Sequence, residues 1–134
     1  MTTAGSVRYA TDVIKIGPLV SDFMAQGIVI FFAEGAPEEL LEFCALHRPV
    51  VKAGGIQPGD ELRIDDHRLT ILAVGEVADA NLTALGHISV KANGENVAPL
   101  PGDVCVEKIE FPELHEGSRI EIVAGVTAET ERTS

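Results

Sequence analysis

Residues 60–74 read DELRIDDHRLTILAV, and this stretch decides the fold class because it holds two strand-like segments on either side of a tight turn. The segments 60–64 and 67–74 are rich in Leu and Ile, and Asp65-Asp66 between them is typical of a two-residue hairpin loop. In the second segment, apolar residues occupy both alternating sets of positions, so we expect both faces to be at least partly covered. The stretch therefore predicts a β-hairpin within a larger β-structure.

Similar segments recur on both sides of this hairpin at nearly even spacing. They are short and β-branched, and they comprise residues 7–16, 27–33, 49–53, 87–92, 104–111 and 119–123. Residues 27–33 (GIVIFFA) form a continuous apolar run, which is typical of a strand buried on both faces. Short strands at such spacing predict an antiparallel barrel or sandwich, and closure into a barrel removes aggregation-prone edges. We expect a mainly β protein built as a single closed antiparallel β-barrel.

Two segments break the β pattern. Residues 37–47 (PEELLEFCALH) predict a short helix, because Pro37 suits the first helical position and apolar residues follow at i, i+3, i+4 and i+7: Leu40, Phe43, Cys44 and His47. Pro49 then disfavours helical geometry at the residue before it, so the helix should end at about His47.

Residues 79–85 predict a minor helical turn, with Asp79 as N-cap and Gly86 just beyond the C-terminal end. We expect residues 7–126 to form the single domain. Residues 1–6 and 127–134 are expected to be a flexible N-terminus and a flexible C-terminal tail.

Composition excludes several classes of function. The chain has 134 residues and a formal net charge of −11, which argues against binding nucleic acid or an anionic membrane surface. Its opening residues do not resemble a secretion signal, and its longest apolar run is far shorter than a membrane span, so we expect no membrane insertion. A cytoplasmic protein with Cys44 and Cys105 as free thiols is the simplest interpretation.

Common catalytic and cofactor-binding motifs are absent, and we expect no cofactor and no metal. His47 is the most informative polar residue, and two interpretations are open. It is either a histidine that interacts favourably with the dipole of the helix it ends, or an exposed nucleophile that accepts a phosphoryl group at the mouth of the barrel. Cys44 lies three residues earlier, which would allow a thiol–imidazole pair, although packing is the favoured role for this cysteine.

Three further residues are candidates for a phosphate site near His47. His87 is predicted to begin a strand at the barrel rim, where it is either an ordinary rim histidine or a hydrogen-bond donor to a transferring phosphate. Gly54 and Gly55 form either a simple turn or a nest of backbone N–H groups that binds the phosphate.

Several stretches resemble one known family. The run EGAPEELLEFCALH (residues 34–47) resembles the glucitol/sorbitol-specific IIA component of the bacterial phosphotransferase system, and so does HRLTILAVGEVADANLTALGHIS (residues 67–89). Two shorter segments, GIQPGDEL and PGDVCV, also fit the family, so that the resemblance extends over about residues 7–125.

The resemblance implies a function and a reactive residue. Members of this family accept a phosphoryl group on a histidine from the histidine-containing phosphocarrier protein. They pass it to a IIB domain, which phosphorylates the hexitol as it enters through the membrane IIC component. The family's phosphorylated histidine ends the EGAP run, which places it at His47. Two alternatives are a regulatory or binding module on the same barrel that relays no phosphate, and a small enzyme dependent on cysteine or metal.

Overall fold

The hairpin predicted from residues 60–74 forms as strands β4 (Glu61–Ile64) and β5 (His67–Val74) in the computed structural model, which describes residues 6–125. Asp65, at the turn, has a φ of 54°, in the left-handed region that two-residue hairpin loops require. Its backbone N–H donates to the Arg119 carbonyl and its carboxylate accepts from the Arg119 N–H. The turn is therefore tied to residue 119, in the strand that pairs with residues 61–64.

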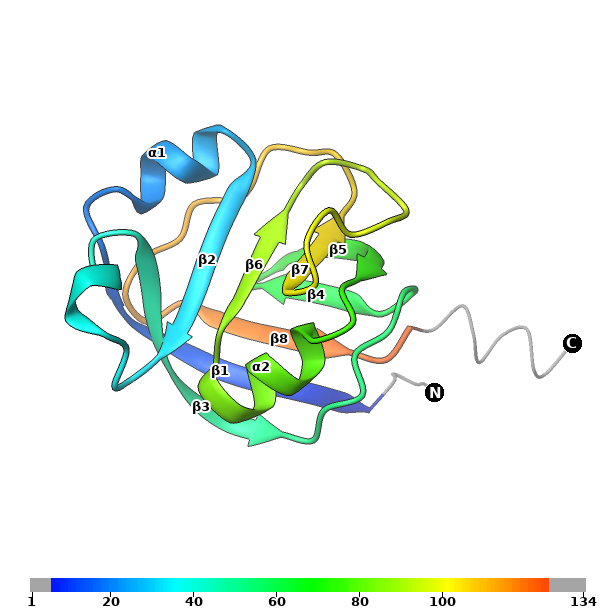
Figure 1. Cartoon of the computed structure of the whole chain (residues 1–134), viewed down its shortest axis with the longest axis horizontal. Helices are drawn as coiled ribbons and strands as arrows, with labels where there is room; N and C mark the ends of the chain where they lie inside the picture. The colour runs from blue at the N-terminus through cyan, green and yellow to red at the C-terminus, as the bar shows by residue number, and fades with distance from the viewer. Residues whose placement is uncertain (1–5, 126–134) are drawn as a thin grey trace, which may run out of the picture.

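Eight strands close into a barrel within the described residues (Figure 1), which confirms the predicted fold class. The other strands are β1 (Val7–Ile16), β2 (Ile28–Ala33), β3 (Cys44–Lys52), β6 (Ile88–Lys91), β7 (Asp103–Val106) and β8 (Arg119–Val123). The helical elements are α1 (Val20–Ala25), the 3-10 turn η1 (Glu38–Leu40) and α2 (Ala78–Leu85). The expectations of flexibility for residues 1–6 and 127–134 fall, except for Ser6, outside the described residues.

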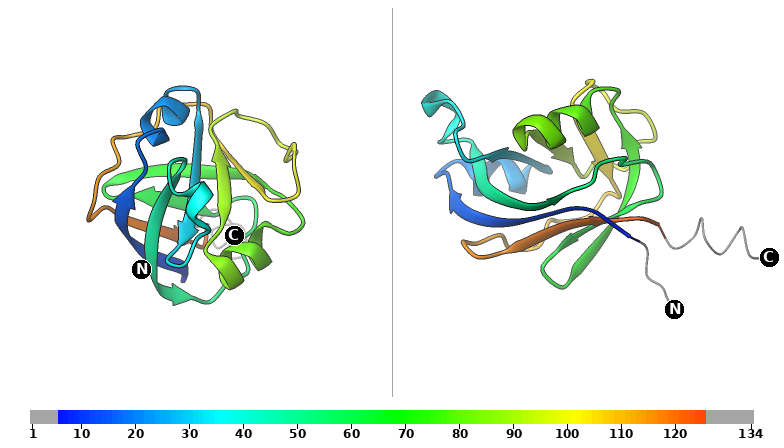
Figure 2. Two further views of the ribbon diagram at one scale, coloured as in Figure 1. Left: turned by 60° about the vertical axis from the view of Figure 1, so that its left-hand side comes forward. Right: turned by 90° about the horizontal axis from the view of Figure 1, so that it is seen from below.

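The barrel is not wholly antiparallel, contrary to expectation. Its strands follow the order β1-β3-β2-β6-β7-β5-β4-β8, and β8 pairs with β1 to close it (Figure 2). The pairs β2–β3 and β6–β7 are parallel. In both, a long connection (residues 34–43 and 92–102) returns the chain to the starting end of the previous strand, which a tight hairpin loop cannot do.

The predicted helix over residues 37–47 is wrong. Only η1 is helical, and β3 begins at Cys44 and runs through His47. Pro37 has ψ of 140°, which is extended rather than helical. Because β3 lies between β1 and β2, its backbone gains a ladder of hydrogen bonds on each side, whereas an isolated helix of this length is marginal in water.

The second helical prediction is confirmed, and one helix was missed. α2 extends the expected turn by one residue, and Gly86 has the left-handed φ of 66° typical of the position after a helix. The N-cap is Val77 and not Asp79. The six-residue α1 lies at the opposite end of the barrel from α2 (Figure 1), between a proline at position 18 and a glycine at position 27.

Apolar side chains from all the strands fill the barrel interior. The core also includes Ala78 and Leu82, through which α2 packs onto one end of the barrel. This packing matters for the site, because the chain leaving α2 at Gly86 then crosses that end before it enters β6.

The buried carboxylate of Asp60 links three segments of the barrel. Asp60 is 2% exposed, and its carboxylate accepts from Arg8 Nε at 2.6 Å and from the backbone N–H of Gln57 at 2.9 Å and Gly125 at 3.2 Å. Asp60 thus joins β1, the turn before β4 and the residues after β8.

We predict that Asp60→Asn lowers the free energy of unfolding by about 2–3 kcal/mol, because it removes the charge from a buried, hydrogen-bonded ion pair. Asp12→Asn is the matched control, since Asp12 also binds an arginine, Arg119, but both side chains are exposed. Its loss should stay below about 1 kcal/mol. Urea denaturation measures both values, and equal losses would contradict the role assigned to burial.

Candidate functional site

His47 lies inside the barrel. Its side chain is 0% exposed and projects inward from β3, which pairs with β1 and β2. The exposed helix end expected for this residue is therefore wrong, because residues 44–52 form a strand in the wall of the barrel.

Both ring nitrogens of His47 are hydrogen-bonded. Nε2 lies 2.7 Å from the carbonyl oxygen of Gly86, and Nδ1 lies 2.6 Å from Oγ1 of Thr11. A carbonyl can only accept, so Nε2 carries the proton in this arrangement, and the Thr11 hydroxyl donates to the lone pair of Nδ1. The two contacts fix both the orientation of the ring and its tautomer.

The ring is surrounded by apolar groups. The rings of Tyr9 and Phe31 meet it edge-on, with centroids at 6.2 Å and 6.0 Å. Burial lowers the pKa of the His47 imidazole, and the hydrogen bond to Gly86 opposes this effect only in part. The imidazole is consequently neutral at pH 7 and keeps one nucleophilic lone pair.

Little space is left beside the ring. The cavity that His47 lines with Tyr9, Thr11, Phe31 and Leu82 has a volume of about 10 Å³. This is about the volume that one water molecule needs, so a phosphoryl group does not fit in the closed arrangement.

One turn covers the Nε2 side of His47. A Cβ on Gly86 would come within 2.5 Å of the Ala33 Cβ and 3.0 Å of His47 Cε1, so only glycine fits. On either side of Gly86, Leu85 is 49% exposed and His87 is half-buried. The turn at residues 85–87, called the cover turn below, is thus the layer between Nε2 and the surface.

His87 lies at the same end of the barrel as His47. Its ring stacks on that of Phe32 with a centroid distance of 4.7 Å, and burial lowers its pKa. His87 was expected to begin a strand, but β6 begins one residue later, at Ile88.

Gly54 and Gly55 do have the positive φ values of a nest, 82° and 86°. Their N–H groups are already paired, however. Gly54 donates to the Arg8 carbonyl, and Gly55 donates to the Asp79 carboxylate at 2.9 Å. The anion that occupies this nest is the protein's own side chain, and we leave the two glycines out of the proposed phosphate site.

The cysteines show no sign of reactivity. Cys44 and His47 are three residues apart in a strand, so their side chains point to opposite faces and do not form the pair considered from sequence. Burial raises the pKa of both Cys44 and Cys105, which keeps them as thiols. Within residues 6–125, no three His, Cys, Asp or Glu side chains are grouped to hold a metal ion.

Thr11 and Gly86 are the site residues that sequence reasoning missed. No local pattern points to Thr11, which is distant in sequence from His47 and meets it only because β1 pairs with β3. Gly86 was expected to end a helix, but nothing in the sequence places its carbonyl against the histidine.

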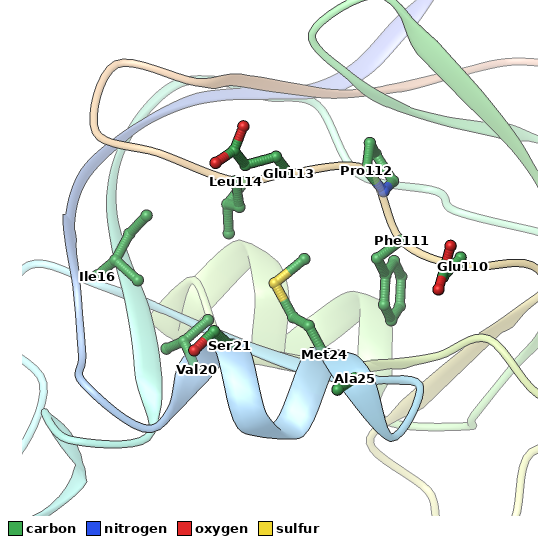
Figure 3. Close-up of a pocket in the computed structure, with 10 residues that line it drawn as sticks. All are labelled: Ile16, Val20, Ser21, Met24, Ala25, Glu110, Phe111, Pro112, Glu113 and Leu114. Atoms are coloured by element: carbon green, nitrogen blue, oxygen red, sulfur yellow. The ribbon is translucent and has the colours of Figure 1, made fainter.

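A separate groove lies at the other end of the barrel. It has a volume of about 330 Å³ and lies between α1 and residues 110–114 (Figure 3), where Met24, Phe111 and Leu114 face one another. None of the candidate site residues lines it. In the described part of the chain, no helix is long and apolar enough to span a bilayer.

Known proteins share this fold. The crystal structure of a PTS system IIA component from Enterococcus faecalis V583 matches with a TM-score of 0.73 at 22% identity, covering 86% of this chain and 99% of that chain. The two proteins therefore share a fold.

Sequence comparison defines the family more narrowly. Residues 8–121 match the family described as PTS system glucitol/sorbitol-specific IIA component. The EIIA components of that name from Shigella flexneri and Escherichia coli (strain K12) are each 38% identical over 101 residues, which cover 75% of this chain and 82% of each relative. The chain belongs to the glucitol/sorbitol-specific IIA component family. Membership supports a phosphocarrier role, a phosphotransferase activity in general and interaction with other components of the system.

We predict that stability falls as the pH is lowered from about 7 to about 5.5. The unfolded chain protonates His47 near its ordinary pKa of about 6.5, whereas burial lowers the pKa of this group in the folded protein, so acid favours the unfolded state. The contribution of this group between the two pH values is at most about 1 kcal/mol. Urea midpoints at the two pH values measure it, and His47→Gln should reduce the difference. An unchanged difference in this variant would contradict the assignment.

Tyr9→Phe tests the polarity of the cavity. Among the described residues the Tyr9 hydroxyl has no hydrogen-bond partner, although it is buried, and burial raises its pKa to about 12. Because an unpaired buried hydroxyl costs about 1–3 kcal/mol, we expect the variant to be as stable as the wild type or more so. Thermal unfolding measures the change, and a clear loss of stability would reveal a partner for the hydroxyl.

Proposed function

We propose that His47 accepts a phosphoryl group from the histidine-containing phosphocarrier protein and passes it to a IIB domain during uptake of glucitol/sorbitol through the IIC component. The main support is a neutral, fully buried imidazole beneath a single turn, at the end of the run of residues 34–47 that resembles the family. We place this reaction in the cytoplasm.

Burial of a histidine costs free energy unless its ring nitrogens are hydrogen-bonded, and this cost favours a chemical role for His47 over simple packing. An aliphatic residue would pack against Tyr9 and Phe31 without polar groups that must be paired. His47 instead has two dedicated hydrogen-bond partners, Thr11 and Gly86.

The reaction needs a lone pair on a ring nitrogen of His47. It also needs the cover turn to move, because the cavity beside the ring is too small for a phosphoryl group. A neutral ring nitrogen attacks the phosphorus, the new N–P bond forms, and the bond from phosphorus to the carrier's histidine breaks with its electron pair left on that nitrogen. The transition state is loose, so catalysis depends mostly on holding the ring in position. Transfer to the IIB domain is the same exchange, with His47 as the leaving group.

The test is reconstitution with enzyme I, the phosphocarrier and phosphoenolpyruvate. We expect wild-type protein to gain an acid-labile, base-stable label and His47→Gln to gain none, since glutamine supplies no nucleophilic ring nitrogen. His67→Gln is the control, because His67 is exposed on β5. Label on His47→Gln at the wild-type level would refute the assignment. Labelling without delivery to the IIB domain would favour a regulatory module.

His87→Ala addresses the second histidine. If the half-buried ring donates a hydrogen bond to the phosphoryl oxygens once the cover turn has moved, the variant should accept phosphate but relay it about a hundredfold more slowly. Rapid-quench measurement of transfer to the IIB domain gives the rate. Wild-type kinetics would make His87 a rim residue that only stacks on Phe32.

A further inference from the structure

We propose that the hydroxyl of Tyr9 is a catalytic group that donates a hydrogen bond to the phosphoryl oxygens during transfer to and from His47. This inference rests on the proposed function, because it names a residue that stabilises the same phosphoryl group in transit.

The Tyr9 hydroxyl is a buried donor that the closed barrel does not use. The side chain is 2% exposed, and its hydroxyl has no hydrogen-bond partner among residues 6–125. Burial of an unpaired hydroxyl costs free energy, and a phenylalanine would fill the same space without that cost. The backbone is fixed on both sides, because Tyr9 pairs with Lys52 of β3 and with Ile122 of β8. Tyr9 therefore holds a donor in place before any ligand arrives.

Tyr9 and His47 line the same small cavity, and their rings meet edge-on with centroids 6.2 Å apart. Leu82 of α2 lines this cavity as well. It is tied to the cover turn, since its carbonyl accepts from the Gly86 N–H at 2.9 Å. A movement of the cover turn that carries Leu82 with it would therefore enlarge the space beside both rings. A phosphoryl group on His47 would then share that space with the Tyr9 hydroxyl.

The cavity offers a phosphoryl group few other donors. The group carries negative charge on three oxygens, which hydrogen-bond donors stabilise strongly where water is excluded. The Thr11 hydroxyl is already paired with the His47 ring. Apart from Tyr9, the other residues that line the cavity are apolar: Phe31, Leu62, Leu82, Ile88, Ile120 and Ile122. Tyr9 is thus the one uncommitted side-chain donor in this lining.

The hydroxyl keeps its proton throughout the transfer. Burial raises the pKa of Tyr9 to about 12, so the phenol remains a donor at pH 7. The bond from His47 to phosphorus forms, and the bond from phosphorus to the carrier's histidine breaks with its electron pair left on that nitrogen. Because the hydroxyl is unpaired before transfer and paired during it, the interaction stabilises the transition state more than the ground state, which is the condition for a faster reaction.

Tyr9→Phe removes only the hydroxyl. We expect the variant to accept phosphate about a hundredfold more slowly at saturating phosphocarrier protein, although it folds at least as stably as the wild type. The carrier concentration that gives half the maximal rate should not change, because the side chain is buried away from a docked partner. Rapid-quench labelling measures both quantities. A wild-type maximal rate, or a change confined to the half-saturating concentration, would overturn the role of Tyr9.

Ile122→Val is the matched control, because Ile122 lines the same cavity and pairs with Tyr9 but carries no polar group. Loss of a buried methyl group should lower the urea midpoint and leave the maximal rate within about twofold of the wild-type value. Slowing as large as that of Tyr9→Phe would show that packing of the cavity, and not the hydroxyl, limits the transfer, and would overturn the inference.

Wild-type protein gives a second test, which depends on no variant at position 9. Tyr9 is the only tyrosine of the chain, so tyrosine labelled with ¹³C at Cζ, the carbon that bears the hydroxyl, gives a single signal. Phosphorylation should move this signal to higher chemical shift, as for a phenol that donates to an anion, and should leave it unmoved in His47→Gln treated with the same mixture. An unmoved signal in phosphorylated wild type would overturn this inference but leave the proposed function intact. A wild-type protein that gains no phosphate on His47 would refute the proposed function itself.

Discussion

Strand β3 pairs with β1 on one side and in parallel with β2 on the other, and the site depends on this insertion. Each ladder fixes the direction of the β3 side chains, so His47 must point into the barrel. The pairing with β1 also brings Thr11 to Nδ1, although 35 residues of other structure separate the two along the chain. The candidate imidazole thus becomes part of the wall of the barrel.

Burial gives the imidazole its chemical character. Desolvation keeps the ring neutral, two hydrogen bonds hold it in place, and apolar rings exclude water from its surroundings. The same burial leaves little room beside the candidate nucleophile, since the cavity there holds about one water molecule. The cover turn at Gly86 is tightly packed over Nε2, which keeps the ring buried, and it belongs to no strand, so its displacement would break no strand ladder. Under the proposed function, the cover turn moves while the strand ladders of the barrel stay paired.

Local patterns predicted much of the fold. The hairpin of residues 60–74, the alternation at residues 119–123 and the Gly86 end of α2 all appear as expected, because turn chemistry and side-chain alternation act over a few residues. The resemblance of residues 34–47 to the family pointed to His47, although the expected exposure of that residue was wrong. The parallel pairs were missed, since the path of a long connection leaves no local signature.

The sequence by itself determined a closed, mainly β barrel and the identity of the candidate nucleophile. Tertiary structure alone decided that residues 44–47 form a strand. The spacing of their apolar side chains also fits one face of a helix, and only the pairing with β1 and β2 favours the extended form. It likewise decided the partners of His47. Thr11 and Gly86 come from opposite sides of the ring and from distant parts of the chain, and only barrel closure brings their oxygens to its two nitrogens.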